Sequence, residues 1–213
     1  MSVQTRIIQW PAGAPDPVLL DEIAALLRAD GVMAFPTDTF YGLGANALSA
    51  AAVEKIYSLK RRDRGKPLAL VVADPAQARA FTRDHPPALD ILARSFWPGP
   101  LTLVLKAGPG FPPEMLGFGG TVALRVPALP WLCALLGRTG FPVTATSANL
   151  SGDGELDDPE AVRLRFEGRT DLIVDGGRTP GGAPSTIVDL TAGAPRLLRP
   201  GAVSWGRILA ALA

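Results

Sequence analysis

The sequence predicts an α/β domain in which helices flank one large, twisted sheet of mixed strand direction. Two features support this fold class. Segments with apolar residues at helical spacing alternate with short apolar runs that suit buried strands, and scattered glycines and prolines mark the turns between them. The chain has 213 residues and no internal repeat, so we expect a single domain over residues 1–213.

The first elements follow this alternation. Residues 17–29 carry apolar side chains at helical spacing, and the helix is expected to stop at Asp30. Residues 32–35 are short and apolar, as in a buried strand. Ser49 is a favourable N-cap for a helix that runs to about residue 59, because its hydroxyl can accept from a free N–H of the first turn.

The remainder of the chain is expected to repeat the pattern. Strands are predicted over residues 68–72, 101–105, 122–126, 143–146, 172–174, 186–190 and 196–198, and helices over 75–82, 87–96, 129–136 and 205–212. Polar loops follow the ends of several of these strands. Open α/β sheets bind their ligands at such strand ends, so we expect the functional site there.

The composition is that of an ordinary globular protein. Apolar residues make up 47% of the chain and charged residues 19%, and no uninterrupted apolar run reaches the ~18 residues of a membrane span. Residues 1–11 lack the apolar core of a signal peptide, and a single cysteine excludes an internal disulfide. We therefore expect a cytoplasmic protein with no membrane contact. The net charge of +1 gives no global attraction to nucleic acid.

The reactive side chains exclude several kinds of catalytic site. The sole histidine, His85, lies in a turn-like segment, and the sole cysteine, Cys133, lies in an apolar run that indicates burial. A Cys–His pair or a Ser–His–Asp triad is therefore poorly supported, as is a zinc site built on several such ligands. The chain has no P-loop motif. Residues 42–47 resemble a dinucleotide fingerprint only weakly, because too long a loop precedes Gly42.

One cluster of cations and one isolated arginine are unusual in this sequence. Five cations and one carboxylate lie between Lys60 and Lys66, which suits either the solvated end of a helix or an anionic ligand. Arg125 lies inside an apolar strand, where it either points to solvent or needs a buried partner. Together with loops rich in hydroxyls and amides, these cations suit a ligand with several negative charges. Nucleotidyl transfer fits, since it depends mainly on positioning and charge neutralisation.

Five motifs become recognisable when they are taken in order. They are residues 35–44 (FPTDTFYGLG), the pair Lys60 and Arg62, the pair Ser147 and Asn149, residues 185–189 (STIVD) and residues 198–201 (LRPG). This set resembles the YrdC/TsaC family of threonylcarbamoyl-adenylate synthases, whose Lys-x-Arg and Ser-x-Asn tetrad it matches. The likeness runs from residue 18 to residue 201, leaving short extensions at both ends.

The resemblance implies a deep, positively charged concavity and a defined reaction. L-threonine and bicarbonate would give a carbamate, which attacks the α-phosphate of ATP and releases pyrophosphate. The product would pass to a separate tRNA threonylcarbamoyltransferase complex, and the concavity would allow weak RNA binding. Mg²⁺ would accompany ATP, because it bridges phosphate oxygens while needing few protein ligands. We therefore expect no metal-binding motif and no organic cofactor.

The resemblance also implies roles for individual residues. Thr39, Arg125, Ser185 and the backbone near Ala145 would hold L-threonine; Lys60, Arg62, Ser147 and Asn149 would be catalytic; and Arg62, Lys66, Thr121, Ser147 and Arg199 would bind ATP. A guanidinium such as that of Arg125 can pair with a carboxylate through two parallel hydrogen bonds.

The chain departs from its relatives at two positions. Val71 stands where some relatives carry a histidine, so that contact to threonine would be missing or supplied by another group. Glu155 stands where relatives can offer a hydroxyl to the nucleotide. A carboxylate would approach phosphate only through Mg²⁺, so Glu155 is left outside the expected site. The chain ends soon after Trp205, as in the short bacterial form of the family.

Two other functions fit parts of the sequence. An RNA-binding module could use the same basic concavity to hold phosphates, although no aromatic stacking surface accompanies it. A carbamoyl-transfer enzyme is the second alternative, since the fold also occurs in enzymes that use carbamoyl phosphate, usually beside further domains. ATP turnover that depends on threonine distinguishes these alternatives from the synthase.

Overall fold

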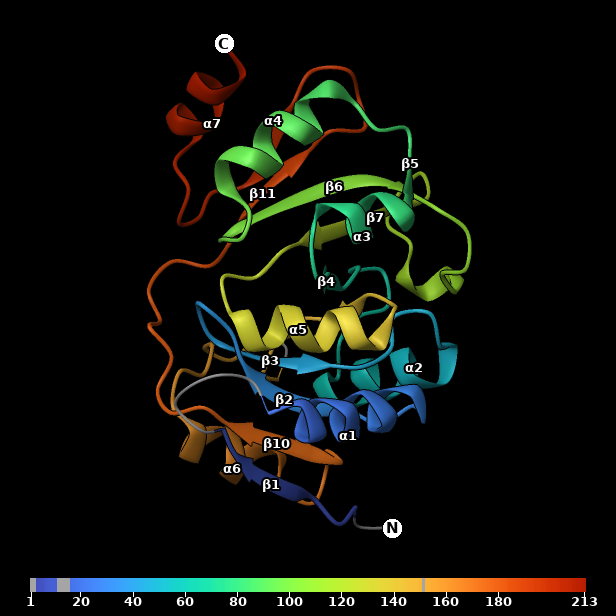
Figure 1. Cartoon of the computed structure of the whole chain (residues 1–213), viewed down its shortest axis with the longest axis vertical. Helices are drawn as coiled ribbons and strands as arrows, with labels where there is room; N and C mark the ends of the chain where they lie inside the picture. The colour runs from blue at the N-terminus through green and yellow to red at the C-terminus, as the bar shows by residue number, and fades with distance from the viewer. Residues whose placement is uncertain (1–2, 11–15, 151) are drawn as a thin grey trace.

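Two sheets of mixed strand direction, flanked by helices, form the domain (Figure 1). The computed structural model describes residues 3–10, 16–150 and 152–213. The expectation for residues 1–11 therefore falls partly outside the described residues, and so does Ser151 in the loop after Ser147. The α/β fold class is confirmed, but the strands that were expected to form one large sheet are divided between two.

The five-stranded sheet has the order β1-β10-β2-β3-β9. Its strands are β1 (Arg6–Gln9), β2 (Met33–Pro36), β3 (Tyr41–Gly44), β9 (Thr146–Ser147) and β10 (Leu172–Asp175). Strand β10 is parallel to both β1 and β2, whereas β3 is antiparallel to both β2 and β9. The loop between β2 and β3 therefore lies at the end of a tight antiparallel pair.

The seven-stranded sheet has the order β12-β11-β6-β7-β4-β8, with β5 paired to β6. Its strands are β4 (Ala69–Val71), β5 (Thr82–Arg83), β6 (Leu101–Ala107), β7 (Thr121–Arg125), β8 (Val143–Thr144), β11 (Thr186–Asp189) and β12 (Arg196–Arg199). The predicted strand over residues 143–146 joins the two sheets. Its first half, β8, pairs with β4, and its continuation, β9, pairs with β3 of the other sheet.

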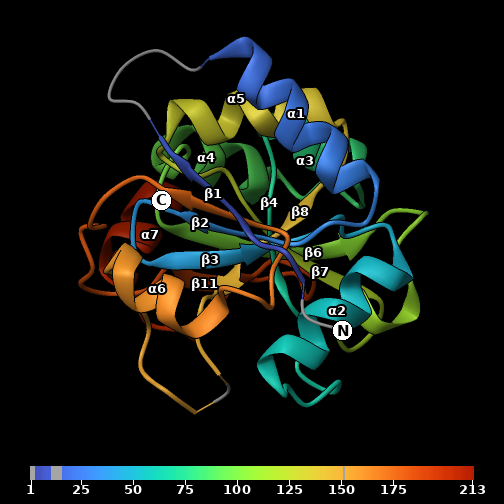
Figure 2. The same cartoon turned by 90° about the horizontal axis from the view of Figure 1, so that it is seen from below.

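Helices cover both faces of the sheets (Figure 2). They are α1 (Pro17–Arg28), α2 (Ala50–Lys60), α3 (Pro75–Ala80), α4 (Pro87–Phe96), α5 (Pro130–Thr139), α6 (Pro159–Phe166) and α7 (Trp205–Leu212), with a 3-10 turn, η1, over Pro113–Met115. Helices α1 and α5 lie on one side, and α2 and α6 lie on the other. The predicted cap is confirmed, because Ser49 Oγ accepts from Ala52 N at 3.2 Å. Among the described helices, none is both long and apolar enough to span a bilayer.

Strand β3 shows why part of the sequence was misread. Residues 42–47 were expected to be a loop before a helix, but Gly42 and Gly44 lie in β3. The ring of Phe35 packs over them, and a Cβ on Gly44 would lie 2.7 Å from Phe35 Cε1. Close packing inside a sheet therefore requires a glycine at position 44, whereas a Cβ on Gly42 would come no nearer than 3.4 Å to the same ring. Strand β1 and helix α6 were not predicted either, and Thr82, expected in a helix, lies in β5.

Candidate active site

A cavity lies between the two sheets, where loops and strand ends from both of them meet. It encloses about 210 Å³. The β2–β3 loop and β3 contribute to one wall, and β4, β7, β11 and β12 contribute to the other. Segments that are far apart in the sequence thus share one space. This confirms that the polar loops at strand ends come together.

Most of the predicted site residues line this cavity. Those that do are Thr39, Arg62, Arg125, Ala145, Ser147, Ser185 and Arg199. Lys60 and Asn149 lie directly behind Ser147, to which both are hydrogen-bonded. Lys66 and Thr121 do not line the cavity, although Pro67, which follows Lys66, and Ala123, two residues after Thr121, do.

Lys60 is a buried cation at the end of α2. Its Nζ donates to the carbonyl oxygens of Ser147 and Asn149 and to Asn149 Oδ1, the last two at 2.8 Å. An ammonium has three N–H groups, so all of its donors are used. Burial, and then the nearby Arg62, lower the pKa of Lys60 to about 8. Lys60 therefore fixes the Ser147–Asn149 segment by hydrogen bonds and places a positive charge next to it.

Arg62 reaches the cavity because the chain reverses immediately after α2. Arg61 adopts a left-handed conformation (φ 49°) and points to solvent, so that Lys60 and Arg62 are directed away from it. The guanidinium of Arg62 donates from Nε to the carbonyl of Lys66 at 3.0 Å and from Nη2 to that of Pro67 at 3.1 Å. These two hydrogen bonds hold the loop in a closed turn around the side chain of Arg62.

Arg125 is buried in β7 with a carboxylate beside it. Its Nη2 donates to Asp38 Oδ1, and the two side chains are only 9% and 13% exposed. Burial, and then the guanidinium of Arg199, lower the pKa of Arg125 to about 10, so the group is charged at neutral pH. Among the described residues, nothing accepts a hydrogen bond from its buried Nε. The alternative that Arg125 points to solvent is excluded.

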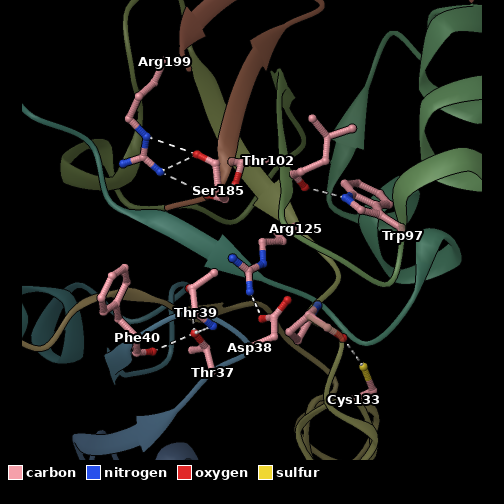
Figure 3. Close-up of polar contacts among 12 residues, drawn as sticks. Thr37, Asp38, Thr39, Phe40, Trp97, Thr102, Arg125, Cys133, Ser185 and Arg199 are labelled. Carbon is pink, nitrogen blue, oxygen red and sulfur yellow. Dashed lines mark hydrogen bonds and ion pairs between the residues drawn. The ribbon is translucent and has the colours of Figure 1, made fainter. Parts of the chain in front are cut away.

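Ser185 and Arg199 form a second polar group beside Arg125 (Figure 3). Arg199 Nη2 donates to the carbonyl of Ser185 at 2.8 Å and to its Oγ at 3.1 Å. The Ser185 hydroxyl also lies 2.9 Å from the hydroxyl of Thr102, in the neighbouring strand β6. Burial lowers the pKa of Arg199. These bonds hold a hydroxyl and a cation at fixed positions on the cavity wall.

The β2–β3 loop supplies hydroxyls on the other side of Arg125 (Figure 3). Thr37 Oγ1 donates to the carbonyl of Phe40 at 2.7 Å and accepts from Thr39 N at 3.2 Å. The hydroxyls of Thr37 and Thr39 are 3.1 Å apart. This local network fixes the turn that carries Thr39 and Asp38.

Some residues of the site were not predicted. Thr37 and Thr102 line the cavity, and so does Glu155, contrary to the expectation that it lies outside the site. The charge of Glu155 acts to raise the pKa of both Lys60 and Arg199. Asp38 was part of a recognised motif but received no role. A signal for it was the lone Arg125 in an apolar strand, because a buried cation requires a counter-ion.

His85 and Cys133 lie apart from the cavity. His85 is exposed, and its Nε2 lies 3.2 Å from the carbonyl oxygens of Arg79 and Thr82. Cys133 is half-buried and donates to the carbonyl of Pro127 at 3.2 Å, and burial raises the pKa of its thiol. Within the described ranges, no group of three or more His, Cys, Asp or Glu side chains is arranged to hold a metal ion.

Comparison with known proteins identifies relatives across most of the chain. The family model Sua5_yciO_yrdC, described as telomere recombination, matches residues 25–201. A threonylcarbamoyl-AMP synthase from Bacillus subtilis is 42% identical over 90% of this chain, and one from Thiobacillus denitrificans is 37% identical over 79% of it. The crystal structure of Pyrococcus abyssi Sua5 complexed with L-threonine superposes with a TM-score of 0.91, at 37% identity over 98% of this chain.

The relatives differ in length from this chain. The matched region covers 89% of the Thiobacillus protein but only 56% of the Bacillus protein and 61% of the Pyrococcus chain. The chain thus spans little more than half the length of the first curated relatives it matches.

Proposed function

Since the chain belongs to the Sua5/YciO/YrdC family, we propose that it is an L-threonylcarbamoyladenylate synthase, a nucleotidyltransferase. It joins L-threonine, bicarbonate and ATP into threonylcarbamoyl-AMP and releases pyrophosphate. The observation that carries this proposal is Arg125, a buried guanidinium with an unused donor that lines a cavity shared with further cations and hydroxyls. Such a group is costly to bury unless an anionic ligand completes its bonding.

The amino-acid end of the cavity consists of Thr39, Arg125, Ala145 and Ser185. Arg125 binds the carboxylate of L-threonine, because its planar fork matches a carboxylate. The hydroxyls of Thr39 and Ser185 bond the amine or hydroxyl of the substrate, and the backbone near Ala145 assists. Support comes from the fixed positions of these hydroxyls, since Ser185 is held by Arg199 and Thr102.

The phosphate end consists of Lys60, Arg62, Ser147 and Asn149, with Lys66, Thr121 and Arg199 as further contacts of ATP. Lys60 and Arg62 neutralise charge on the phosphates, and the Ser147–Asn149 segment orients them. This end is supported by the three donors with which Lys60 holds that segment. Arg199 lies next to Ser185 and so connects the two ends.

The reaction follows from placing these two ends beside each other. The unprotonated threonine amine attacks the carbon of bicarbonate, a C–O bond breaks, and the departing oxygen leaves as water with the proton that the nitrogen loses, which gives a carbamate. A carbamate oxygen then attacks the α-phosphorus of ATP, and the bond to the pyrophosphate oxygen breaks. No protein nucleophile is required, because positioning and neutralisation of charge by preorganised cations lower the barrier. We propose that the cations at both ends give this cavity the basic character that the family resemblance implies.

We further propose that ATP enters as its Mg²⁺ complex. Support comes from Glu155, an exposed carboxylate on the cavity wall, which would supply an oxygen ligand for that ion. The product passes to a tRNA threonylcarbamoyltransferase complex, and the protein acts in the cytoplasm. The RNA-binding and carbamoyl-transfer alternatives are not favoured, because the curated relatives carry the name of the synthase.

The test is pyrophosphate release from ATP with bicarbonate and Mg²⁺, with and without L-threonine. We expect release that depends on L-threonine and is much slower with L-serine at equal concentration. Release that ignores threonine, or no release from a folded sample, contradicts the proposal. Salt-sensitive binding of RNA without such turnover would instead support the RNA-binding alternative.

A further inference from the structure

The ion pair between Asp38 and Arg125 is buried beside the cavity. Both side chains are almost completely buried. Asp38 does not line the cavity, but its neighbours Thr37 and Thr39 do, and so does Arg125. The carboxylate therefore contacts the guanidinium from outside the space that a ligand would occupy. It affects a ligand through its charge and through Arg125.

Arg125 has hydrogen-bonding capacity that Asp38 leaves unused. A guanidinium carries five N–H donors, and the contact to Asp38 uses one nitrogen, Nη2. The buried Nε has no acceptor among the described residues. Nη1 also has no acceptor among the described residues, and it is not enclosed as Nε is. Because Arg125 lines the cavity, a ligand carboxylate can bind this end of the guanidinium without displacing Asp38. Both carboxylates would then share one guanidinium.

Because Asp38 and the ligand would share the Arg125 guanidinium, Asp38 changes the net charge that surrounds the ligand. Arg62, Arg125 and Arg199 line the cavity and would by themselves attract any carboxylate or phosphate. Asp38 neutralises Arg125, and among the described residues the adjacent Arg199 has no carboxylate partner. A ligand that brings only negative charge therefore meets the repulsion of Asp38 as well as the attraction of the arginines. An α-amino acid brings its own ammonium next to its carboxylate. That ammonium restores the balance, because buried charges are stable only when they are paired.

We propose that Asp38 determines specificity: it makes the Arg125 subsite select zwitterionic α-amino acids over carboxylates that lack an α-ammonium group. This inference rests on the proposed function, since it takes the amino-acid end of the cavity to bind L-threonine. Asp38 acts through its negative charge and need not touch the substrate. It is a positioning and selecting residue rather than a catalytic one.

The test compares two ligands in the wild-type chain and in Asp38→Asn. The ligands are L-threonine and (R)-3-hydroxybutanoate, which is threonine without its amino group. Their dissociation constants are measured by NMR titration, so no turnover is needed. We expect the ratio of the threonine constant to the hydroxybutanoate constant to rise about 30-fold in Asp38→Asn, because one partner of a buried charge network is lost. The asparagine retains an oxygen that can accept from Arg125.

The outcomes separate this inference from the proposed function. If wild type fails to bind threonine, the proposed function fails. If wild type binds threonine but both constants of Asp38→Asn change by the same factor, Asp38 only holds Arg125 in place and the inference is overturned. Asp189→Asn is the matched control, because Asp189 is also buried and paired with an arginine, Arg196, but lies outside the cavity. Its ratio should equal that of wild type, and its thermal midpoint shows the cost of neutralising a buried aspartate.

Discussion

The two ends of the cavity present their cations in different ways. At the end where we propose that the amino acid binds, Arg125 projects from the interior of a strand, is 9% exposed on its side chain and is paired with Asp38. At the end where we propose that the phosphates bind, Arg62 projects from an exposed loop, and within the described residues it bonds only to carbonyl oxygens of that same loop. The first arrangement fixes a small subsite before the ligand arrives. The second places charge on a segment that can adjust to a longer, more highly charged ligand.

Among the variants that test this difference between the two ends, Arg125→Ala is expected to have the largest effect on substrate KM. The change should raise the KM for threonine about 100-fold or more, because the substrate carboxylate loses its buried partner. The KM for ATP should change by less than about threefold, as expected for a separate subsite. Steady-state pyrophosphate release at varied concentrations of each substrate measures both constants.

Arg125→Lys is the second variant for this test, since Arg125→Ala leaves Asp38 buried without a counter-ion and is expected to lower the thermal midpoint. The lysine keeps the charge but loses the planar fork, so it should raise the KM for threonine by a smaller factor. If either variant affects the KM for ATP more than that for threonine, the two ends have been assigned the wrong way round.

At the phosphate end, Arg62→Ala should lower the rate of pyrophosphate release about 100-fold, since one preorganised donor to developing charge is removed. The thermal midpoint should remain within a few degrees of that of wild type, because the loop is exposed. Arg64→Ala is the matched control: Arg64 lies in the same loop and pairs with Glu54 outside the cavity. Equal losses in both variants would mean that the loop acts by its overall charge and not through Arg62.

The titration of Lys60 should affect the two ends of the cavity differently. Its pKa is lowered to about 8, so its ammonium loses charge as the pH rises above that value. Nucleotide affinity should therefore fall by about tenfold between neutral and strongly alkaline pH, whereas threonine affinity follows the substrate's own amine. Calorimetric titration of a non-hydrolysable ATP analogue across this range measures the effect. An affinity that stays constant across this range would contradict a role for the charge of Lys60 near the phosphates.

The same titration should make the free energy of unfolding increase as the pH rises. The folded pKa of Lys60 lies below the ordinary value of 10.5, so the unfolded chain binds more protons between these two values. The contribution of Lys60 to the free energy of unfolding is therefore complete above the ordinary pKa and is lost as the pH falls through about 8. Urea unfolding of wild type and Lys60→Met should give a difference in stability that favours wild type increasingly as the pH rises.

The smallest effects are expected outside both ends. His85→Gln and Cys133→Ala should leave the rate of pyrophosphate release within about twofold of wild type, because neither side chain lines the cavity. A large loss in either variant, with an unchanged thermal midpoint, would show that the reaction uses a group that the account places outside the site.

Much of the fold and of the site could be predicted because the relevant signals are local. Helical spacing of apolar residues predicted α1, and a hydroxyl before an apolar run predicted the cap at Ser49. The cluster from Lys60 to Lys66 and the lone Arg125 were visible as charges in unusual places. The family motifs then brought together residues that local patterns cannot connect.

The features that were missed depend on contacts between distant segments. Asp38 gains its role only because β7 places Arg125 beside the β2–β3 loop. Residues 143–146 were predicted to form one strand, and only the pairing partners show that β8 and β9 belong to different sheets. Gly42 and Gly44 resembled part of a glycine-rich fingerprint after a loop, yet both lie in β3, where Gly44 makes room for the ring of Phe35.

The most direct test of the account is to identify the product. The wild-type chain would be incubated with ATP, Mg²⁺, L-threonine and ¹³C-labelled bicarbonate, and the nucleotides analysed by mass spectrometry without delay. The account predicts a threonine adduct of AMP that carries the ¹³C label and is absent when either threonine or bicarbonate is omitted. An AMP adduct that lacks the label, or pyrophosphate released without any adduct that contains threonine, would contradict it.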